Sequence, residues 1–214
     1  MSQTDRAQLF DRWAEKYDTA VTSADGDFPF GGYEQVLDEV VRLADVRPHM
    51  RILDLGIGTG NLAARFLHHD CAVWGIDFSA EMLAHTRAKL PQVNLIQANL
   101  LGEWPPELQP PFDRVVSAYV WHEFDLATKV NLLQRVASRY LSTSGCILVG
   151  DIAFPTSVAR KEAAERWADE WDEDEDYWAA DEAIPACERA GLQVAYKQVS
   201  SCGGVFTFTV RGAG

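Results

Sequence analysis

The sequence lacks the apolar run of about 20 residues that a membrane-spanning helix needs. Its N-terminal segment also lacks the basic-then-apolar pattern of a secretion signal. We therefore expect a cytoplasmic protein that does not insert into membranes.

Basic residues are scarce, since 19 Lys and Arg stand against 32 Asp and Glu, which gives the 214 residues a net charge of −13. Proteins that bind nucleic acids or anionic membranes need a basic surface. We therefore expect neither as a partner, and we expect a small-molecule substrate instead. An oligomer is possible, but no feature of the sequence indicates one.

Patterns of metal ligands are missing as well. The four cysteines are widely scattered with no C-x-x-C pair, and the five histidines show no ligand spacing. The sequence therefore predicts reduced thiols and no metal site.

What the chain does contain is a regular alternation of short apolar runs with amphipathic segments. This alternation predicts a mostly parallel sheet with helices on both faces, and two alternating runs joined by "SCGG" predict an antiparallel C-terminal hairpin. The expected fold class is a Rossmann-like α/β domain of about seven strands. The strands are expected at 51–56, 72–77, 94–99, 112–119, 146–152, 192–200 and 204–210, and helices at 33–44, 61–69, 79–90 and 126–141.

A glycine-rich turn follows the first of these strands, in "RILDLGIGTGNL". Gly56, Gly58 and Gly60 allow positive φ angles and leave no Cβ to block a ligand, and the next helix offers free N–H groups. The turn therefore predicts a site where a ligand closely approaches the backbone.

The spacing around this turn separates three ligand classes. No lysine follows it until Lys89, which excludes a nucleoside-triphosphate loop. Asn61 occupies the place of the third glycine of a dinucleotide loop, which weakens that interpretation. S-adenosylmethionine carries no phosphate and needs backbone contacts with an acid upstream, which Asp54 provides.

The stretch "ILDLGIGTGNL" resembles the first motif of the class I S-adenosylmethionine-dependent methyltransferases, and "FDRWAEKYD" resembles the start of small bacterial members of unassigned substrate. The resemblance extends from Phe10 to Val210. It implies one methyltransferase domain over residues 1–214, with a helical cap at 1–47 and a helical insertion on the acceptor side at 153–190.

The resemblance also implies a cofactor pocket. Asp77 would accept hydrogen bonds from the ribose hydroxyls, and its position about twenty residues after the turn agrees with this role. Phe78 would lie beside the adenine. Asn99 stands where the family has an adenine-binding aspartate, and it is either an acceptor for the adenine amino group or a turn residue. The Leu100 N–H would bind the adenine ring. Tyr17 would close the pocket, or form part of a core-facing helix stripe.

Candidate groups for the chemistry follow the fourth and fifth strands. Tyr119 and His122 lie in "SAYVWHEFD", and Asp151 ends the fifth strand. His122 is the candidate general base, because an ordinary histidine pKa of about 6.5 permits proton uptake near neutrality; alternatively it caps a helix. Asp151 either orients a substrate or caps the next segment.

An acidic segment, "DEWDEDEDYWAADEA", precedes the hairpin. Trp167 and Trp171 are one helical turn apart, so we expect them on one helical face. The segment is either a solvated acidic face with buried tryptophans or an aromatic lid that favours a cationic or amine substrate.

The leading hypothesis is the transfer of a methyl group from S-adenosylmethionine to a small-molecule acceptor. One alternative is a non-catalytic sensor that binds S-adenosylmethionine or S-adenosylhomocysteine. Another is an NAD-dependent oxidoreductase, which shares Asp77 but misfits the loop and the hairpin.

Overall fold

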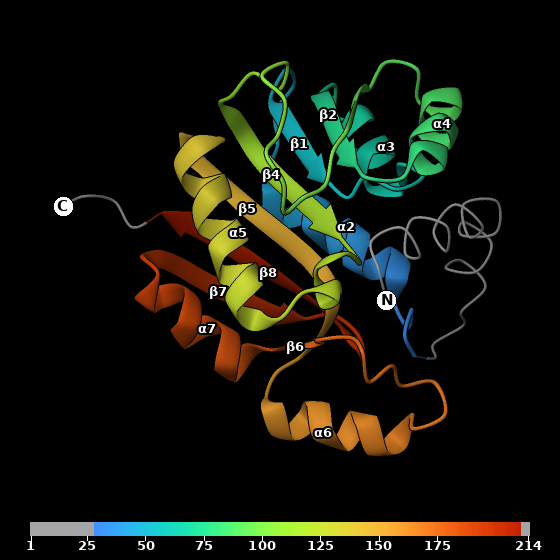
Figure 1. Cartoon of the computed structure of the whole chain (residues 1–214), viewed down its shortest axis with the longest axis vertical. Helices are drawn as coiled ribbons and strands as arrows, with labels where there is room; N and C mark the ends of the chain where they lie inside the picture. Colours follow the sequence, from blue (N-terminus) through green and yellow to red (C-terminus); the bar gives the residue numbers. More distant parts are fainter. Residues whose placement is uncertain (1–27, 211–214) are drawn as a thin grey trace.

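The computed structural model describes residues 28–210, in which helices cover both faces of one sheet (Figure 1). No helix within this range combines the length and the apolar character needed to span a bilayer. The helices are α2 (Tyr33–Ala44), α3 (Asn61–Leu67), α4 (Ala80–Lys89), α5 (Leu126–Arg139), α6 (Ser157–Arg166) and α7 (Ala180–Arg189), with a 3-10 turn η1 (Trp121–Glu123). The strands are β1 (Arg51–Leu55), β2 (Ala72–Asp77), β3 (Asn94–Gln97), β4 (Phe112–Ala118), β5 (Leu141–Phe154), β6 (Trp178–Ala179), β7 (Leu192–Gln198) and β8 (Gly203–Val210).

The strands form a sheet in the order β3-β2-β1-β4-β5-β8-β7. Strands β1 to β5 pair in parallel, whereas β8 pairs antiparallel with both β5 and β7. The short β6 pairs with the end of β5. This topology confirms the predicted fold class, including the C-terminal hairpin.

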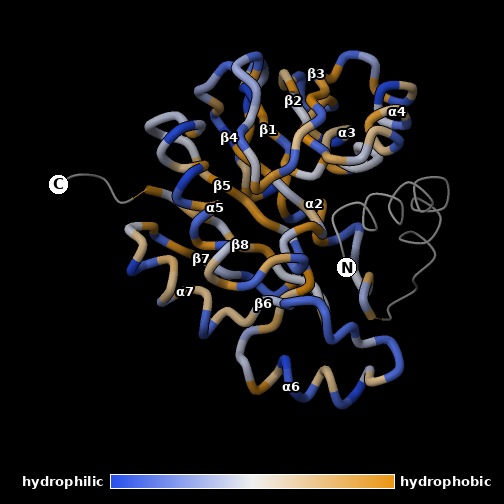
Figure 2. The backbone as a smooth tube through the Cα atoms, viewed as in Figure 1, coloured by the Kyte–Doolittle hydropathy of each residue, from blue (hydrophilic) through white to orange (hydrophobic). Residues whose placement is uncertain are grey.

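Consecutive strand residues face opposite sides of the sheet, so each apolar strand serves two cores. On β4, Val116 packs in the core beneath α2 and α3, while Val115 packs in the core beneath α5 and α7. Figure 2 shows the inner strands as largely hydrophobic. Burial on both sides explains why these strands read as continuous apolar runs.

The order of the strands also places the site. From β1 the chain first adds β2 and β3 on one side of the sheet and then adds β4 on the opposite side of β1. The strand order therefore reverses between β1 and β4. A crevice opens beyond the carboxyl ends of the strands at such a reversal. The turn after β1 and the turn after β4 both end in that crevice.

The segment between β5 and α7 differs from the expectation at two tryptophans. The helix α6 ends at Arg166, so Trp167 and Trp171 do not share a helical face, and that prediction is wrong. Acidic residues follow Trp167, and negative charge at a helix C-terminus is unfavourable. Both rings instead stack on Phe28, with centroid distances of 5.2 and 5.3 Å.

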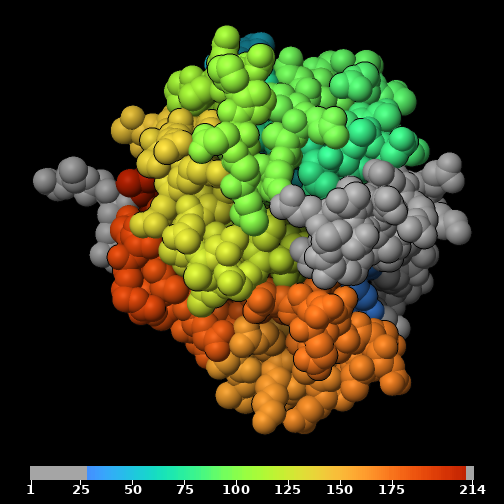
Figure 3. Space-filling model, in the orientation of Figure 1, coloured from blue at the N-terminus to red at the C-terminus, as the bar shows by residue number. Residues whose placement is uncertain are grey.

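The expected insertion at 153–190 contains two kinds of structure. The helix α7 packs on the sheet beside β7. In contrast, α6 and the acidic segment that follows form the lower end of the molecule, coloured orange in Figure 3, and much of this end is hydrophilic in Figure 2. Most of the expected cap, including Tyr17, lies outside the described residues.

A close approach between α2 and β5 gives a test of this packing. A Cβ added to Gly150 would lie 2.7 Å from Cγ1 of Val36 and 2.9 Å from Cγ2 of Val40. We expect Gly150→Ala to lower the free energy of unfolding by about 1–3 kcal/mol, because overpacking forces the helix away. Gly102→Ala is the control, since its nearest neighbour would be 3.5 Å away. Urea denaturation measures both, and equal stabilities would contradict this packing.

Candidate active site

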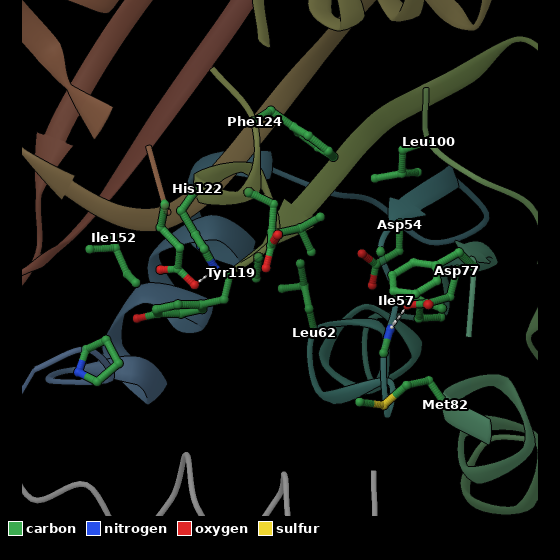
Figure 4. Close-up of a pocket in the computed structure, with 18 of the residues that line it drawn as sticks. Asp54, Ile57, Leu62, Asp77, Met82, Leu100, Tyr119, His122, Phe124 and Ile152 are labelled. Atoms are coloured by element: carbon green, nitrogen blue, oxygen red, sulfur yellow. Dashed lines mark hydrogen bonds and ion pairs between the residues drawn. The ribbon is translucent and has the colours of Figure 1, made fainter. Parts of the chain in front are cut away.

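A cavity of about 960 Å³ lies beyond the carboxyl ends of β1, β2 and β4. Figure 4 shows Asp54, Asp77 and Met82 at one end of it, and Tyr119, His122 and Ile152 at the other. We call these the loop end and the histidine end. Most of the predicted site residues line the cavity: Asp54, Gly56, Gly58, Asp77, Phe78, Asn99, Leu100, Tyr119 and His122.

The three glycines of the loop have different roles. All have positive φ angles, of 73° at Gly56, 53° at Gly58 and 83° at Gly60. An added Cβ would lie 2.5 Å from Val120 at Gly56 and 2.8 Å from Leu90 at Gly60, so both positions are needed for packing. At Gly58 the nearest atom would be 4.0 Å away. Gly58 is therefore the position that leaves bare backbone along the cavity, and Gly60 does not line it.

The carboxylate of Asp77 joins this loop to the next helix. Its Oδ2 accepts a hydrogen bond from the Gly58 N–H at 2.9 Å, and its Oδ1 accepts one from the Ser79 N–H at 2.9 Å. Ser79 in turn caps α4 by accepting from the Met82 N–H at 3.1 Å.

Asp54 is the least compensated group of the cavity. Its side chain is 2% exposed, and Oδ2 has no hydrogen-bond partner among residues 28–210. Burial, together with the charge of Asp77, raises the pKa of Asp54 to about 8. An unpaired carboxyl of this kind favours a ligand that brings a positive charge.

The residues expected at the adenine follow β2 and β3. Phe78 is 39% exposed and presents an apolar ring to the cavity, and the buried Leu100 forms part of its wall. The Oδ1 of Asn99 accepts a hydrogen bond from the Leu101 N–H at 2.8 Å, which is the pattern of an Asx turn. Asn99 thus stabilises a turn and lines the cavity.

A buried aspartate holds the histidine. Nδ1 of His122 lies 2.6 Å from Oδ1 of Asp151, and the His122 backbone N–H donates to Oδ2 at 2.9 Å. Nε1 of Trp178 also donates to Oδ2, at 3.1 Å. Asp151 is fully buried and does not line the cavity, so it contacts His122 rather than the space for a substrate.

This pairing changes the acid–base behaviour expected of His122. Burial lowers the pKa of the imidazole, but the charge and hydrogen bond of Asp151, together with Glu175 and Glu123, outweigh burial and raise it to about 9. His122 is therefore an imidazolium at neutral pH in the ligand-free protein. The expectation of an ordinary pKa was wrong because sequence spacing did not reveal the contact with Asp151.

Tyr119 directly follows β4 with a φ angle of 55°, a left-handed conformation that side chains other than glycine rarely adopt. Its ring packs against those of Tyr33 and Phe30, at centroid distances of 4.9 and 5.7 Å. Its hydroxyl is without a hydrogen-bond partner among the described residues, although the residue is only 7% exposed. Burial raises the pKa of the phenol, which therefore stays neutral.

Sequence reasoning missed the approach of Glu175 to His122. The acidic segment is fastened to η1 by a hydrogen bond of 2.7 Å from the Asp176 N–H to the His122 carbonyl. It brings Oε1 of Glu175 to 3.8 Å from Nε2 of His122. His122, Glu123 and Glu175 place potential metal-ligand atoms within 4.8 Å of one another. Only the acidity of the segment, not its position, was visible in the sequence.

Comparisons with known proteins agree on one family. A family profile described as "Methyltransferase domain" matches residues 52–145. An uncharacterized methyltransferase of Geobacillus thermodenitrificans is 33% identical over 161 residues, which cover 73% of this chain and 71% of that protein.

Two solved structures share the fold. Magnesium protoporphyrin IX methyltransferase from Synechocystis PCC 6803 with bound SAH has a TM-score of 0.75 at 16% identity, covering 99% of this chain and 100% of that chain. A DhpI–SAM–HEP complex has a TM-score of 0.70 at 19% identity, covering 98% and 99%. At these identities the likeness concerns the fold.

The unpaired carboxyl of Asp54 leads to a prediction on stability. Its folded-state pKa of about 8 exceeds the ordinary 3.8, so its burial destabilises the fold increasingly as the pH rises between these values. We expect Asp54→Asn to raise the free energy of unfolding of the ligand-free protein by roughly 1–3 kcal/mol at about pH 8, with no gain at about pH 4.

Urea unfolding at the two pH values measures the effect. Asp70→Asn is the control, because Asp70 is exposed. A loss of stability in Asp54→Asn at the higher pH would show that the carboxylate is compensated within the protein.

Proposed function

We propose, given that this chain belongs to the class I S-adenosylmethionine-dependent methyltransferases, that it methylates a small-molecule acceptor at the histidine end of the cavity. The observation that carries the proposal is a single cavity with two chemically different ends. The loop end combines bare backbone at Gly58 with the unpaired Asp54, whereas the other end holds His122 against Asp151.

The loop end suits the methionine part of S-adenosylmethionine. The orphaned Oδ2 of Asp54 would receive the ammonium group, which would supply the positive charge that this buried carboxyl lacks. The open space over Gly58 would admit the ligand to the backbone. Asp77, already fixed by two backbone N–H groups, would accept from the ribose hydroxyls.

The wall formed after β2 and β3 suits the adenine. The exposed ring of Phe78 offers a stacking surface. The Asn99 amide and the Leu100 backbone would form hydrogen bonds with the polar edge of the adenine. The turn that Asn99 stabilises holds its side chain in place. When bound, S-adenosylmethionine supplies an electrophilic methyl group carried on a positively charged sulfur.

Several observations support a small-molecule acceptor. A cavity of about 960 Å³ has the size of pockets that enclose cofactors and compact ligands. The net charge of −13 opposes binding to nucleic acids. Among proteins of the same fold, one is named for magnesium protoporphyrin IX, itself a small molecule.

His122 would take the proton that an acceptor releases. Its Nδ1 is occupied by Asp151, so Nε2 is the nitrogen left to face the cavity, and Trp178 fixes the aspartate in turn. Asp151 and Trp178 are therefore positioning residues. The pKa of His122 falls when positive charge enters the cavity, because cations oppose a second cation. Binding of a charged ligand thus converts His122 towards the form that accepts protons.

Cofactor binding tests the role of Asp77. S-adenosylhomocysteine should raise the melting temperature by mass action, whereas NAD should not. Asp77→Ala should weaken S-adenosylhomocysteine binding by about 2–3 kcal/mol, because it removes the ribose acceptor and the partner of the Gly58 N–H. Calorimetry measures the loss. Unchanged affinity would place the ribose elsewhere, and a shift with NAD alone would contradict the cofactor.

A second test concerns His122 as the base. His122→Ala should lower kcat by about 10²–10⁴ while leaving S-adenosylhomocysteine affinity nearly unchanged. In the native enzyme kcat should rise with pH through a value below about 9, because bound positive charge lowers the pKa that Asp151, Glu175 and Glu123 raise in the ligand-free protein, and the variant should lose this limb.

His85→Ala is the control, since His85 is an exposed histidine on α4. Native kcat and an unchanged pH profile in His122→Ala would make His122 structural. Both profiles are measured with an acceptor found by screening labelled methyl transfer.

A further inference from the structure

The ionisable groups of the histidine end are strongly biased towards negative charge. Its lining carboxylates are Glu123, Asp125, Glu170, Asp172 and Glu175. Among the described residues that line the cavity there is no lysine or arginine. His122 can carry a positive charge, but the fully buried Asp151 already compensates it at 2.6 Å. The described groups around the space for an acceptor therefore carry mainly negative charge.

Glu175 is the carboxylate most firmly built into this end. Its side chain is only 21% exposed, and its Oε1 lies 3.8 Å from Nε2 of His122. The Tyr177 hydroxyl forms a hydrogen bond with the Glu175 carboxylate. The Asp176 N–H donates to the His122 carbonyl at 2.7 Å and so holds the same segment against η1. Glu175 thus differs from the exposed acids of its segment, such as Glu173, which does not line the cavity.

An independent observation comes from Tyr119. Its hydroxyl is buried without a hydrogen-bond partner in the described part of the chain, and the residue is 7% exposed. Figure 4 shows its ring reaching along the cavity from His122 towards Ile152. A neutral phenol can accept a hydrogen bond from an N–H group of a ligand. The aromatic rings of Phe30, Tyr33 and Tyr177 also line this end, and aromatic faces attract cations.

We propose that the acceptor is an amine, which Glu175 and Asp172 attract as an ammonium ion and whose N–H the Tyr119 hydroxyl accepts. This inference rests on the proposed methyltransferase function and names its substrate class. Carboxylates or phosphates as the group to be methylated are disfavoured, because among the described lining residues only His122 can carry a positive charge, and Asp151 already compensates that charge.

The charge balance of the reaction fits an amine. The ammonium first passes a proton to neutral His122. The nitrogen lone pair then forms the new N–C bond while the C–S bond breaks and its electron pair stays on sulfur, so the positive charge moves from sulfur to nitrogen. Carboxylates around the nitrogen stabilise that developing charge. An anionic oxygen or sulfur acceptor would become neutral in the same step, so the carboxylates would not stabilise its transition state.

Binding of matched probes tests the proposal without relying on turnover. The protein is saturated with S-adenosylhomocysteine, and calorimetry compares 2-phenylethylamine, 3-phenylpropionate and the neutral 3-phenylpropanol. We expect the amine to bind at least about tenfold more tightly than the carboxylate, with the alcohol between them. Glu175→Gln should weaken amine binding about tenfold, whereas Glu173→Gln should leave it unchanged.

The outcomes separate this inference from the function on which it rests. Absence of S-adenosylhomocysteine binding would defeat the proposed function itself. Normal S-adenosylhomocysteine binding with equal or tighter binding of 3-phenylpropionate, or with no preference among the probes, would overturn the amine proposal alone. Equal losses in Glu175→Gln and Glu173→Gln would also overturn it, because the effect would then come from overall charge. S-adenosylhomocysteine affinity of each variant confirms that it is folded.

Discussion

Three aspartates lie buried at the carboxyl ends of strands, Asp54 on β1, Asp77 on β2 and Asp151 on β5. A buried carboxylate needs hydrogen bonds or positive charge to replace the water it has lost. Asp77 obtains them from backbone N–H groups of the loop and the next helix, and Asp151 obtains them from His122 and a tryptophan. Asp54 has no such compensation among the described residues for its Oδ2 atom. The described part of the fold therefore leaves one buried carboxyl oxygen uncompensated, as a site for a cationic ligand would.

The same constraint connects the two ends of the cavity. Asp151 compensates the charge on His122 at Nδ1, and Glu175 of the acidic segment approaches Nε2 of the same ring. Carboxyl groups thus lie around both the place of the cofactor ammonium and the place of the acceptor. Such a site lowers the stability of the empty protein and is stabilised when cationic groups enter it. Binding and folding stability are coupled through these few groups.

The sheet, its helices and the glycine loop could be predicted because they depend on local patterns. Apolar runs mark strands, and Gly56, Gly58 and Gly60 mark the turn before α3. The environment of His122 could not be predicted, because Glu175 lies about fifty residues away in sequence and reaches it only through the path of the acidic segment. The end of α6 before Trp167 was missed for a related reason, since helical spacing does not show where a helix stops. Tertiary contacts decide both features.

Proton linkage at Asp54 tests the central claim most directly, since its pKa of about 8 means that the carboxyl is mostly protonated at neutral pH in the ligand-free protein. Calorimetry of S-adenosylhomocysteine binding at neutral pH, in buffers of different ionisation enthalpy, counts the protons released on binding. If the ligand ammonium compensates Asp54, binding should release close to one proton more in the native protein than in Asp54→Asn, because His122 contributes equally in both. Equal proton release in the two proteins would show that Asp54 is not the group that receives the positive charge.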